Sequence, residues 1–95
     1  MTVFVISRRR VDAFTEDQFA PLMEAEAEEA RRLYGDSHLR AIYSMADTPG
    51  AILQFECASV EEAKKLMGRL PLCAAGMLDM TFIPVRPYRG FLPSS

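Results

Sequence analysis

The chain has 95 residues and a formal net charge of -2; 49% of its residues are hydrophobic and 25% are charged. This composition is typical of one folded globular domain and excludes a disordered chain, and the near-neutral charge predicts no nucleic-acid partner. At this size a hydrophobic core is possible but marginal, so we expect a partner subunit to help complete it.

The two cysteines, Cys57 and Cys73, lack CxxC spacing, and the chain has a single histidine, so no metal site is predicted. We interpret the cysteines as reduced, structural thiols of a cytoplasmic protein. The N-terminus lacks the charge order of a signal peptide, and no apolar run approaches the ~18 residues of a membrane span, so no membrane partner is expected. The arginine run at residues 8–10 is interpreted as the solvated edge of a strand.

The first half of the chain reads as a strand followed by a helix. Residues 3–9 are rich in β-branched and aromatic side chains, which predicts the strand. The sequence TEDQ at residues 15–18 matches a capping box and opens a helix that runs to about Tyr34, with Gly35 as its stop. Pro21 removes an intrahelical hydrogen bond, so we expect a kink there or a separate first turn.

The second half reads as a hairpin, a helix and a last strand. Residues 38–46 and 51–57 are predicted strands joined by the turn sequence DTPG. The sequence SVEE at residues 59–62 opens a helix with apolar residues at helical spacing, and Pro71 is expected to end it. The last strand runs from about residue 77 to residue 85. Residues 86–95 form a proline-punctuated tail.

The element order βαββαβ predicts an α+β, ferredoxin-like fold over residues 1–95, with two helices on one face of a four-stranded antiparallel sheet. The other face of the sheet is left bare. Because apolar residues occur on both sides of the predicted strands, we expect that face to pack on the sheet of a second copy. The sequence therefore predicts a homodimer or a higher oligomer.

Glu26 breaks the amphipathic pattern of the first helix. At ~100° per residue the apolar side chains gather on one side and Glu26 falls among them, whereas Glu24 and Glu28 point away. A carboxylate against apolar surface loses hydration, which raises its pKa toward the range of a general acid or base. Two interpretations stay open: Glu26 is an acid/base group, or it lies at the edge of the apolar stripe or in a structural ion pair.

Arg40 is the expected partner of Glu26. On a regularly alternating second strand it shares a face with His38, and an inward Arg40 would neutralise Glu26 or hold an anionic substrate. His38 and Tyr43 are candidates for substrate contacts, although a lone histidine is more often structural. The chain contains no nucleotide-binding or hydrolase motif, which leaves those functions without support.

Two stretches resemble the muconolactone delta-isomerase family: SVEEAKKLMGRLPLCAAGMLDM at residues 59–80, with its SVE helix start and LPL joint, and LMEAEAEEARRL at residues 22–33, with its E-x-E element. The resemblance implies a dimeric α+β barrel and a cofactor-free shift of a double bond in a small unsaturated lactone acid, within aromatic compound catabolism. Matched by position, it implies an acid/base role for Glu26 and a catalytic role for Arg40.

The sequence also departs from that family. Ala41 stands where the isomerases have a histidine, and Ala74 and Ala75 stand where they have a proline and an aromatic residue. We expect the joint at residues 70–76 to cover a pocket between helices and sheet, with Leu72 and Ala75 contacting the substrate and the alanines enlarging the pocket.

Three functions stay open: an isomerase-like enzyme without a cofactor, a dimeric-barrel cyclase or cofactor-free oxygenase acting on a polyketide or aromatic substrate, and a non-catalytic binding protein.

Overall fold

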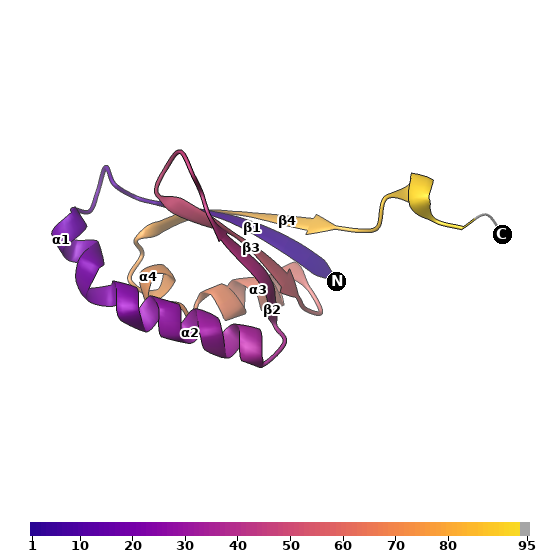
Figure 1. Ribbon diagram of the computed structural model, residues 1–95, viewed down its shortest axis with the longest axis horizontal. Helices are drawn as coiled ribbons and strands as arrows, with labels where there is room; N and C mark the ends of the chain where they lie inside the picture. The colour runs from indigo at the N-terminus through magenta and orange to yellow at the C-terminus, as the bar shows by residue number, and fades with distance from the viewer. Residues whose placement is uncertain (94–95) are drawn as a thin grey trace.

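The computed structural model of the protein describes residues 1–93 and has the predicted ferredoxin-like α+β fold. Four antiparallel strands form one sheet in the order β2-β3-β1-β4, and the helices cover one of its faces (Figure 1). The strands are β1 (Thr2–Arg9), β2 (Leu39–Ser44), β3 (Gly50–Glu56) and β4 (Leu78–Val85). The helices on the sheet are α2 (Met23–Gly35), α3 (Val60–Met67) and the short α4 (Pro71–Ala74).

The first helical segment is divided at Pro21, as the sequence predicts. It consists of α1 (Glu16–Phe19), a 3-10 turn η1 (Ala20–Leu22) that holds the proline, and then α2. At its start, the side-chain oxygen of Gln18 accepts a 2.7 Å hydrogen bond from the backbone N–H of Thr15. Gly35 is the last residue of α2, also as predicted.

Pro71 begins a helix and does not end one, which corrects the sequence-based prediction. The capping residue Ser59 accepts a 3.1 Å hydrogen bond from the N–H of Glu62, and α3 then ends before Gly68. After a short turn, Pro71 opens α4, because proline is tolerated in the first turn of a helix, where its missing N–H needs no partner. The joint expected at residues 70–76 is therefore partly helical.

A β-bulge interrupts the alternation of β2. Leu39 pairs with Phe55, but Ala41 pairs with Gln54, so Arg40 is an extra residue on this strand. Beyond the bulge, Ile42 pairs with the buried Leu53 and faces the helices. Residues 38, 40 and 42 therefore do not share one face, contrary to the regular alternation that the sequence suggested.

The core fills the space between the sheet and the helices. Its largest fully buried side chains come from strands and helices alike and include Val3, Val5, Phe19, Leu33, Leu39, Leu53, Phe55, Met67 and Leu70. A smaller apolar cluster lies between α1 and α4 and is formed by Phe19, Leu72 and Met77. On β1 the core-facing positions continue from Val3 and Val5 to Ser7 and Arg9, so the core gives way to polar groups at the end of that strand.

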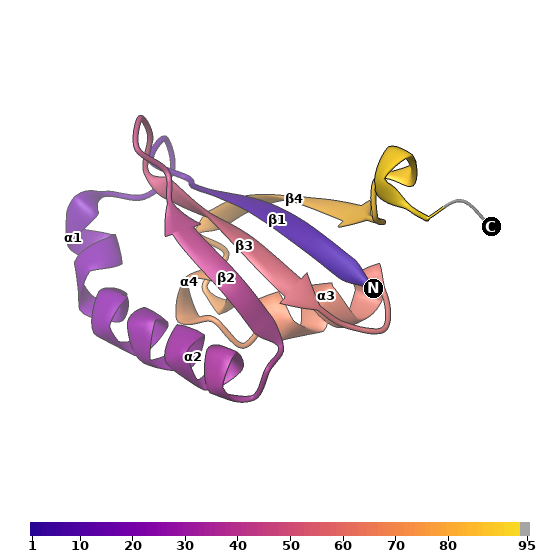
Figure 2. The same ribbon diagram turned by 45° about the vertical axis from the view of Figure 1, so that its right-hand side comes forward.

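The opposite face of the sheet is largely apolar, and no helix within residues 1–93 covers it (Figure 2). Phe4 and Ile6 of the central strand β1 are half-buried there. The surface, which we call the bare face, continues in exposed apolar side chains of the other strands. Ile52 pairs with Ile6 and Ile83 pairs with Phe4, while Tyr43 lies opposite Ile52 and Val85 lies opposite Thr2. Contiguous apolar surface of this kind marks an interaction site.

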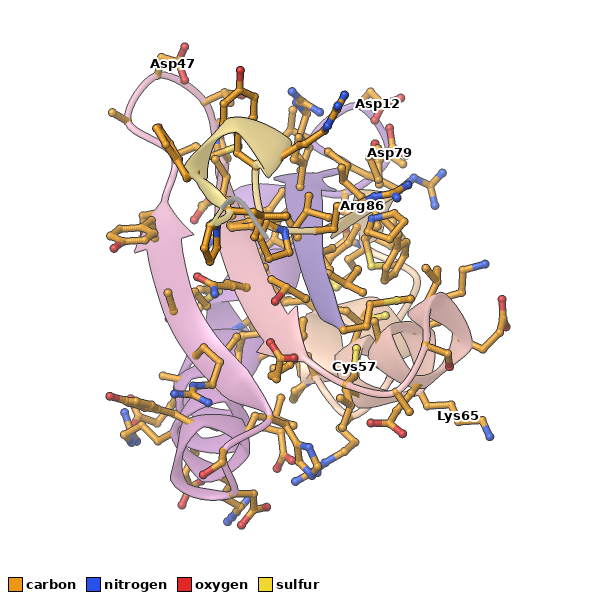
Figure 3. The ribbon with its side chains drawn as sticks, turned by 90° about the vertical axis from the view of Figure 1, so that its right-hand side faces the viewer. Asp12, Asp47, Cys57, Lys65, Asp79 and Arg86 are labelled. Carbon is orange, nitrogen blue, oxygen red and sulfur yellow. The ribbon has the colours of Figure 1, made fainter. Side chains whose placement is uncertain are left out.

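The C-terminal tail projects away from the rest of the molecule. It leaves β4, contains the 3-10 turn η2 (Arg89–Phe91), and lies on the side of the sheet away from α2 (Figures 1 and 3). The molecule measures 56 × 27 × 21 Å, and its radius of gyration is 14.7 Å. A compact chain of this length has a radius of about 12 Å. Residues 94 and 95 of the predicted tail lie outside the described residues.

No helix within residues 1–93 is long and apolar enough to cross a membrane.

Candidate functional site

The carboxylate of Glu26 is held between α2 and α4. Glu26 is half-buried, and its Oε1 accepts a 2.9 Å hydrogen bond from the backbone N–H of Leu72. Leu72 is itself buried, and its carbonyl accepts a hydrogen bond from the N–H of Met77, which fixes the chain beyond α4. The contact therefore holds one carboxylate oxygen in a defined place.

Burial raises the pKa of Glu26 above its usual value. The hydrogen bond from Leu72 and the positive charge of Arg9 act in the opposite direction but do not cancel the loss of hydration. The amphipathic pattern of the helix predicted this environment, and the structure has Glu26 on the side of α2 that faces the sheet. A carboxyl group with a raised pKa can exchange protons closer to neutral pH.

Glu26 lines a pocket of about 230 Å³ between the helices and one end of the sheet. This is smaller than the ~300–1,000 Å³ of most ligand pockets, so the pocket suits a small molecule. The walls are mostly apolar and include Met23, Ala27, Ala30, Ile42, Leu53, Met67, Leu70, Leu72 and Leu78. The polar and charged side chains in the lining are Ser7, Arg9, Glu26 and Ser44.

Arg9 is the cation of this pocket, and the sequence-based interpretation missed it. Its guanidinium lies 5.6 Å from the centre of the Phe19 ring, in a cation–π contact. The sequence suggested that residues 8–10 form a solvated strand edge, but only Arg8 and Arg10 are exposed. The period-2 alternation of β1 was the available signal, because it puts Arg9 on the same face as the buried Val5.

Arg40 does not lie in the Glu26 pocket. It is exposed and lines a second cavity together with Tyr43. The pKa of Glu56 is lowered, chiefly by a hydrogen bond from Thr2, and the charge of Arg40 adds to this effect. The bulge in β2 explains why the expected pairing of Arg40 with Glu26 is not formed.

The other candidates for substrate contacts lie in different places. Leu72 lines the Glu26 pocket, as expected for the joint. His38 is half-buried and lines neither cavity; its N–H donates to the carbonyl of Leu33, and its carbonyl accepts from the N–H of Glu56. Ala75 and Ala74 are exposed and do not line the pocket, so these alanines do not enlarge it as expected.

The second cavity is an open groove of about 670 Å³ between α2 and β2, which we call the α2–β2 groove. Its lining residues are Ala27, Ala30, Arg31, Tyr34, Leu39, Arg40, Ala41, Ile42, Tyr43 and Ser44. Four of them, Ala27, Ala30, Ile42 and Ser44, also line the Glu26 pocket. The groove and the pocket are therefore neighbouring spaces on the same side of the molecule.

Metal-ligating side chains are not grouped in the described part of the chain: residues 1–93 contain no cluster of three or more His, Cys, Asp or Glu arranged to hold an ion. Cys57 and Cys73 are free thiols, and burial raises the pKa of both.

No family model and no curated protein matches this chain significantly. Among solved structures, the chain is similar to 5-chloro-2-hydroxyhydroquinone dehydrochlorinase (TftG) from Burkholderia phenoliruptrix AC1100, in its complex with 2,5-dihydroxybenzoquinone. The TM-score is 0.68 at 15% sequence identity, and the match covers 95% of this chain and 98% of TftG. The similarity shows a common fold over nearly the whole of both chains.

Proposed function

We propose that the protein is an acid/base enzyme that moves a proton within a small unsaturated lactone or carbonyl acid, in the manner of a muconolactone isomerase. The observation that carries this proposal is the environment of Glu26. Its carboxylate is half-buried in a small pocket, its pKa is raised, and Leu72 holds one of its oxygens. These are the properties of a group that takes and returns a proton near neutral pH.

In the proposed reaction, ionised Glu26 removes a proton from a carbon that is α or vinylogous to the substrate carbonyl. The electron pair of the broken C–H bond moves into the substrate, and negative charge develops on the carbonyl oxygen. Protonated Glu26 then returns the proton to a different carbon, and the double bond shifts without any net gain or loss of atoms. Oε1 accepts the hydrogen bond from the N–H of Leu72, so Oε2 is the carboxylate oxygen that exchanges the proton with the substrate.

Arg9 takes the role for which Arg40 was the sequence-based candidate. Its guanidinium lines the same pocket as Glu26, and its charge already lowers the pKa of that carboxyl group. A fixed cation stabilises an enolate oxygen or a substrate carboxylate as negative charge develops. We keep Arg40 and Tyr43 as candidates for contacts with a substrate that enters through the α2–β2 groove, where both are lining residues.

The test is to follow the ultraviolet absorbance of muconolactone with the wild-type protein, the Glu26→Gln variant and the Glu24→Gln variant. Glu24 is exposed on the same helix and serves as the matched control. We expect turnover by wild type, a loss of at least ~100-fold in Glu26→Gln, and no change in Glu24→Gln. Wild type without turnover would contradict the proposed substrate, and full activity in Glu26→Gln would contradict the proposed mechanism.

A second candidate is a reaction of the same pocket on a hydroxylated aromatic ring, as in a cyclase or a cofactor-free oxygenase. It is favoured by the fold shared with TftG, whose solved complex holds 2,5-dihydroxybenzoquinone. Titrating that quinone into the protein and recording its visible absorbance tests this candidate, since transfer of the anionic ring from water to an apolar pocket beside Arg9 would change its spectrum. A protein that neither turns over muconolactone nor binds the quinone would favour the non-catalytic alternative.

We also propose that two copies of the chain form a dimer through the bare face. The central residues of this face, Phe4 and Ile6, are flanked by exposed apolar side chains on β3 and β4. Homodimer interfaces are more apolar than the rest of a protein surface, and a face of this kind is the surface that a second sheet can cover.

A further inference from the structure

The hydroxyl of Ser7 is a buried polar group without a partner in the fold. Ser7 is 3% exposed, and it is the one polar or charged side chain among the buried residues of the part of the chain that the structure describes. Its hydroxyl makes no hydrogen bond to another group within residues 1–93. Every fully enclosed side-chain oxygen or nitrogen in that range does have a partner, so the hydroxyl of Ser7 must open onto a cavity. That cavity is the Glu26 pocket, which Ser7 lines.

Arg9 is the second unpartnered group of this pocket. Its side chain is half-buried, yet its guanidinium forms no ion pair with a carboxylate of residues 1–93. It contacts the ring of Phe19 instead. A cation that has lost part of its hydration is stabilised by an anion beside it. The pocket therefore offers a place for a negatively charged group of a ligand.

The pairing of the strands brings these two groups to one wall of the pocket. Ser7 and Arg9 are two positions apart on β1, so their side chains lie on the same face of the sheet, about 7 Å apart along the strand. Ser7 stands opposite Ala51 of the neighbouring strand β3 (Figure 2). Ala51 and Gly50, which also line the pocket, are small and leave room in front of this wall. A small anion there can reach the short hydroxyl and the long guanidinium side chain together.

Glu26 lies across the pocket from this wall, because it comes from α2 and the pocket lies between helices and sheet. The wall formed by β1 presents a hydroxyl and a cation, the helix presents a carboxylate, and most of the remaining lining is apolar. Hydrogen bonds to an ionised acceptor are about twice as strong as those between neutral groups. The pocket can therefore orient a small acid with its carboxylate at β1 and its carbon skeleton toward Glu26.

We propose that Ser7 is a specificity-determining residue of the pocket. Its hydroxyl donates a hydrogen bond to the carboxylate of a small acid, and Arg9 supplies the counter-charge. The inference rests on the proposed function for the choice of this pocket as the substrate site. It gives the pocket a preference for an acid over the corresponding neutral ester, because the ester is the weaker acceptor and carries no charge for Arg9.

Ligand binding tests the proposal without any need for turnover. Benzoate and methyl benzoate are titrated separately into ¹⁵N-labelled protein, and their dissociation constants are measured from the amide shifts of the pocket residues. All proteins carry Glu26→Gln, which removes the negative charge that would repel benzoate. We expect added Ser7→Ala to raise the dissociation constant of benzoate about tenfold or more, and that of methyl benzoate less than about threefold. Ser7→Thr keeps the hydroxyl and should bind benzoate within about threefold of the protein with Ser7.

Thermal unfolding separates this role from a structural one. A hydroxyl without a partner adds nothing to the stability of the fold, so Ser7→Ala should have a Tm equal to or above that of the protein with Ser7. A lowered Tm together with equal weakening of both ligands would show that the hydroxyl supports the fold, and would overturn the proposal. It would also be overturned if benzoate did not bind, if Ser7→Ala bound it unchanged, or if Ser7→Thr lost binding as Ser7→Ala does.

Kinetics with muconolactone separates the failure of this inference from the failure of the proposed function. In an active enzyme, Ser7→Ala should raise KM about tenfold with little change in kcat, since the carboxylate is bound equally in the ground state and the transition state. Benzoate binding that depends on Ser7, in a protein without muconolactone turnover, would contradict the proposed function alone. Turnover in a protein whose benzoate binding does not depend on Ser7 would contradict the role of Ser7 alone.

Discussion

The backbone N–H of Leu72 donates a 2.9 Å hydrogen bond to Oε1 of Glu26, across 46 positions of sequence. The bond favours the ionised carboxylate and so offsets part of the cost of burying it. Burial still has the larger effect, since the pKa of Glu26 remains raised. The pocket therefore holds a carboxyl group that is fixed in position and easier to protonate than one in water.

Glu26→Gln should stabilise the protein at neutral pH. The pKa of Glu26 is higher in the folded chain than in the unfolded chain, so folding favours the protonated form of this group. The free energy of unfolding of wild type therefore falls as the pH rises from about 4, the unfolded-state pKa, through the folded-state pKa. A glutamine can still accept the Leu72 hydrogen bond but carries no charge. Thermal unfolding followed by circular dichroism should give a higher Tm than wild type at pH ~7 and an equal Tm at pH ~3. The same difference at both pH values would contradict this account.

Arg9→Gln should move the acidic limb of the pH–activity profile to higher pH, because the cation that lowers the pKa of Glu26 is lost. It should also lower kcat/KM about tenfold or more, because the same cation stabilises negative charge on the substrate in the proposed reaction. Arg9→Lys keeps the charge and should keep the position of that limb. Arg8→Gln, at an exposed neighbouring position, is the control for loss of charge on β1. If Arg8→Gln and Arg9→Gln shifted the profile equally, the effect would come from net charge and not from the pocket.

Glu29 of α2 forms an ion pair with Arg69 in the segment after α3. Removing the Glu29 carboxylate should destabilise the protein in a pH-dependent way. Its carboxylate lies 2.9 Å from Nη1 of Arg32 and 2.8 Å from Nη2 of Arg69, and only 15% of its side chain is exposed. Hydrogen bonds from both arginines lower the pKa of Glu29. Its stabilising contribution is thus present above the unfolded-state pKa of about 4.3 and is lost as pH falls through the lower folded-state value.

Urea unfolding of Glu29→Gln checks this prediction. The free energy of unfolding should be lower than that of wild type at pH ~7, and the difference should shrink toward pH ~2. Glu28→Gln, which removes an exposed carboxylate 3.6 Å from the same Arg32, should have the smaller effect. A deficit in Glu29→Gln that is as large in acid as at neutral pH would rule out the ionised bridge as its cause.

Phe4→Asp should separate the proposed dimer into folded monomers. Phe4 lies on the central strand β1, opposite Gln54 on one side and Ile83 on the other. A carboxylate there would be desolvated beneath a second sheet, so the dissociation constant should rise by ~100-fold or more. Analytical ultracentrifugation measures the change, and Ala25→Asp on the exposed side of α2 is the control. A Phe4→Asp protein that remains dimeric at the wild-type concentration would exclude the bare face as the interface.

The sequence by itself determined the features that depend on local periodicity and local chemistry. The order of strands and helices, the break at Pro21 and the side of α2 on which Glu26 lies all follow from patterns within a few residues, because a helix repeats every 3.6 residues and a strand every two. The helical repeat alone puts Glu26 among the apolar side chains of its helix. The same two-residue rule applied to β1 would have separated Arg9 from Arg8 and Arg10.

Only the tertiary structure decided which distant groups meet Glu26. The bulge at Arg40 depends on how β2 pairs with β3, and one extra residue reverses every later side chain on the strand. Arg40 is therefore absent from the pocket. The sequence predicted that Pro71 ends a helix, whereas in the structure Pro71 opens α4, which brings the N–H of Leu72 to Glu26. Pairing and packing join residues far apart in sequence, so neither result could be obtained from local patterns.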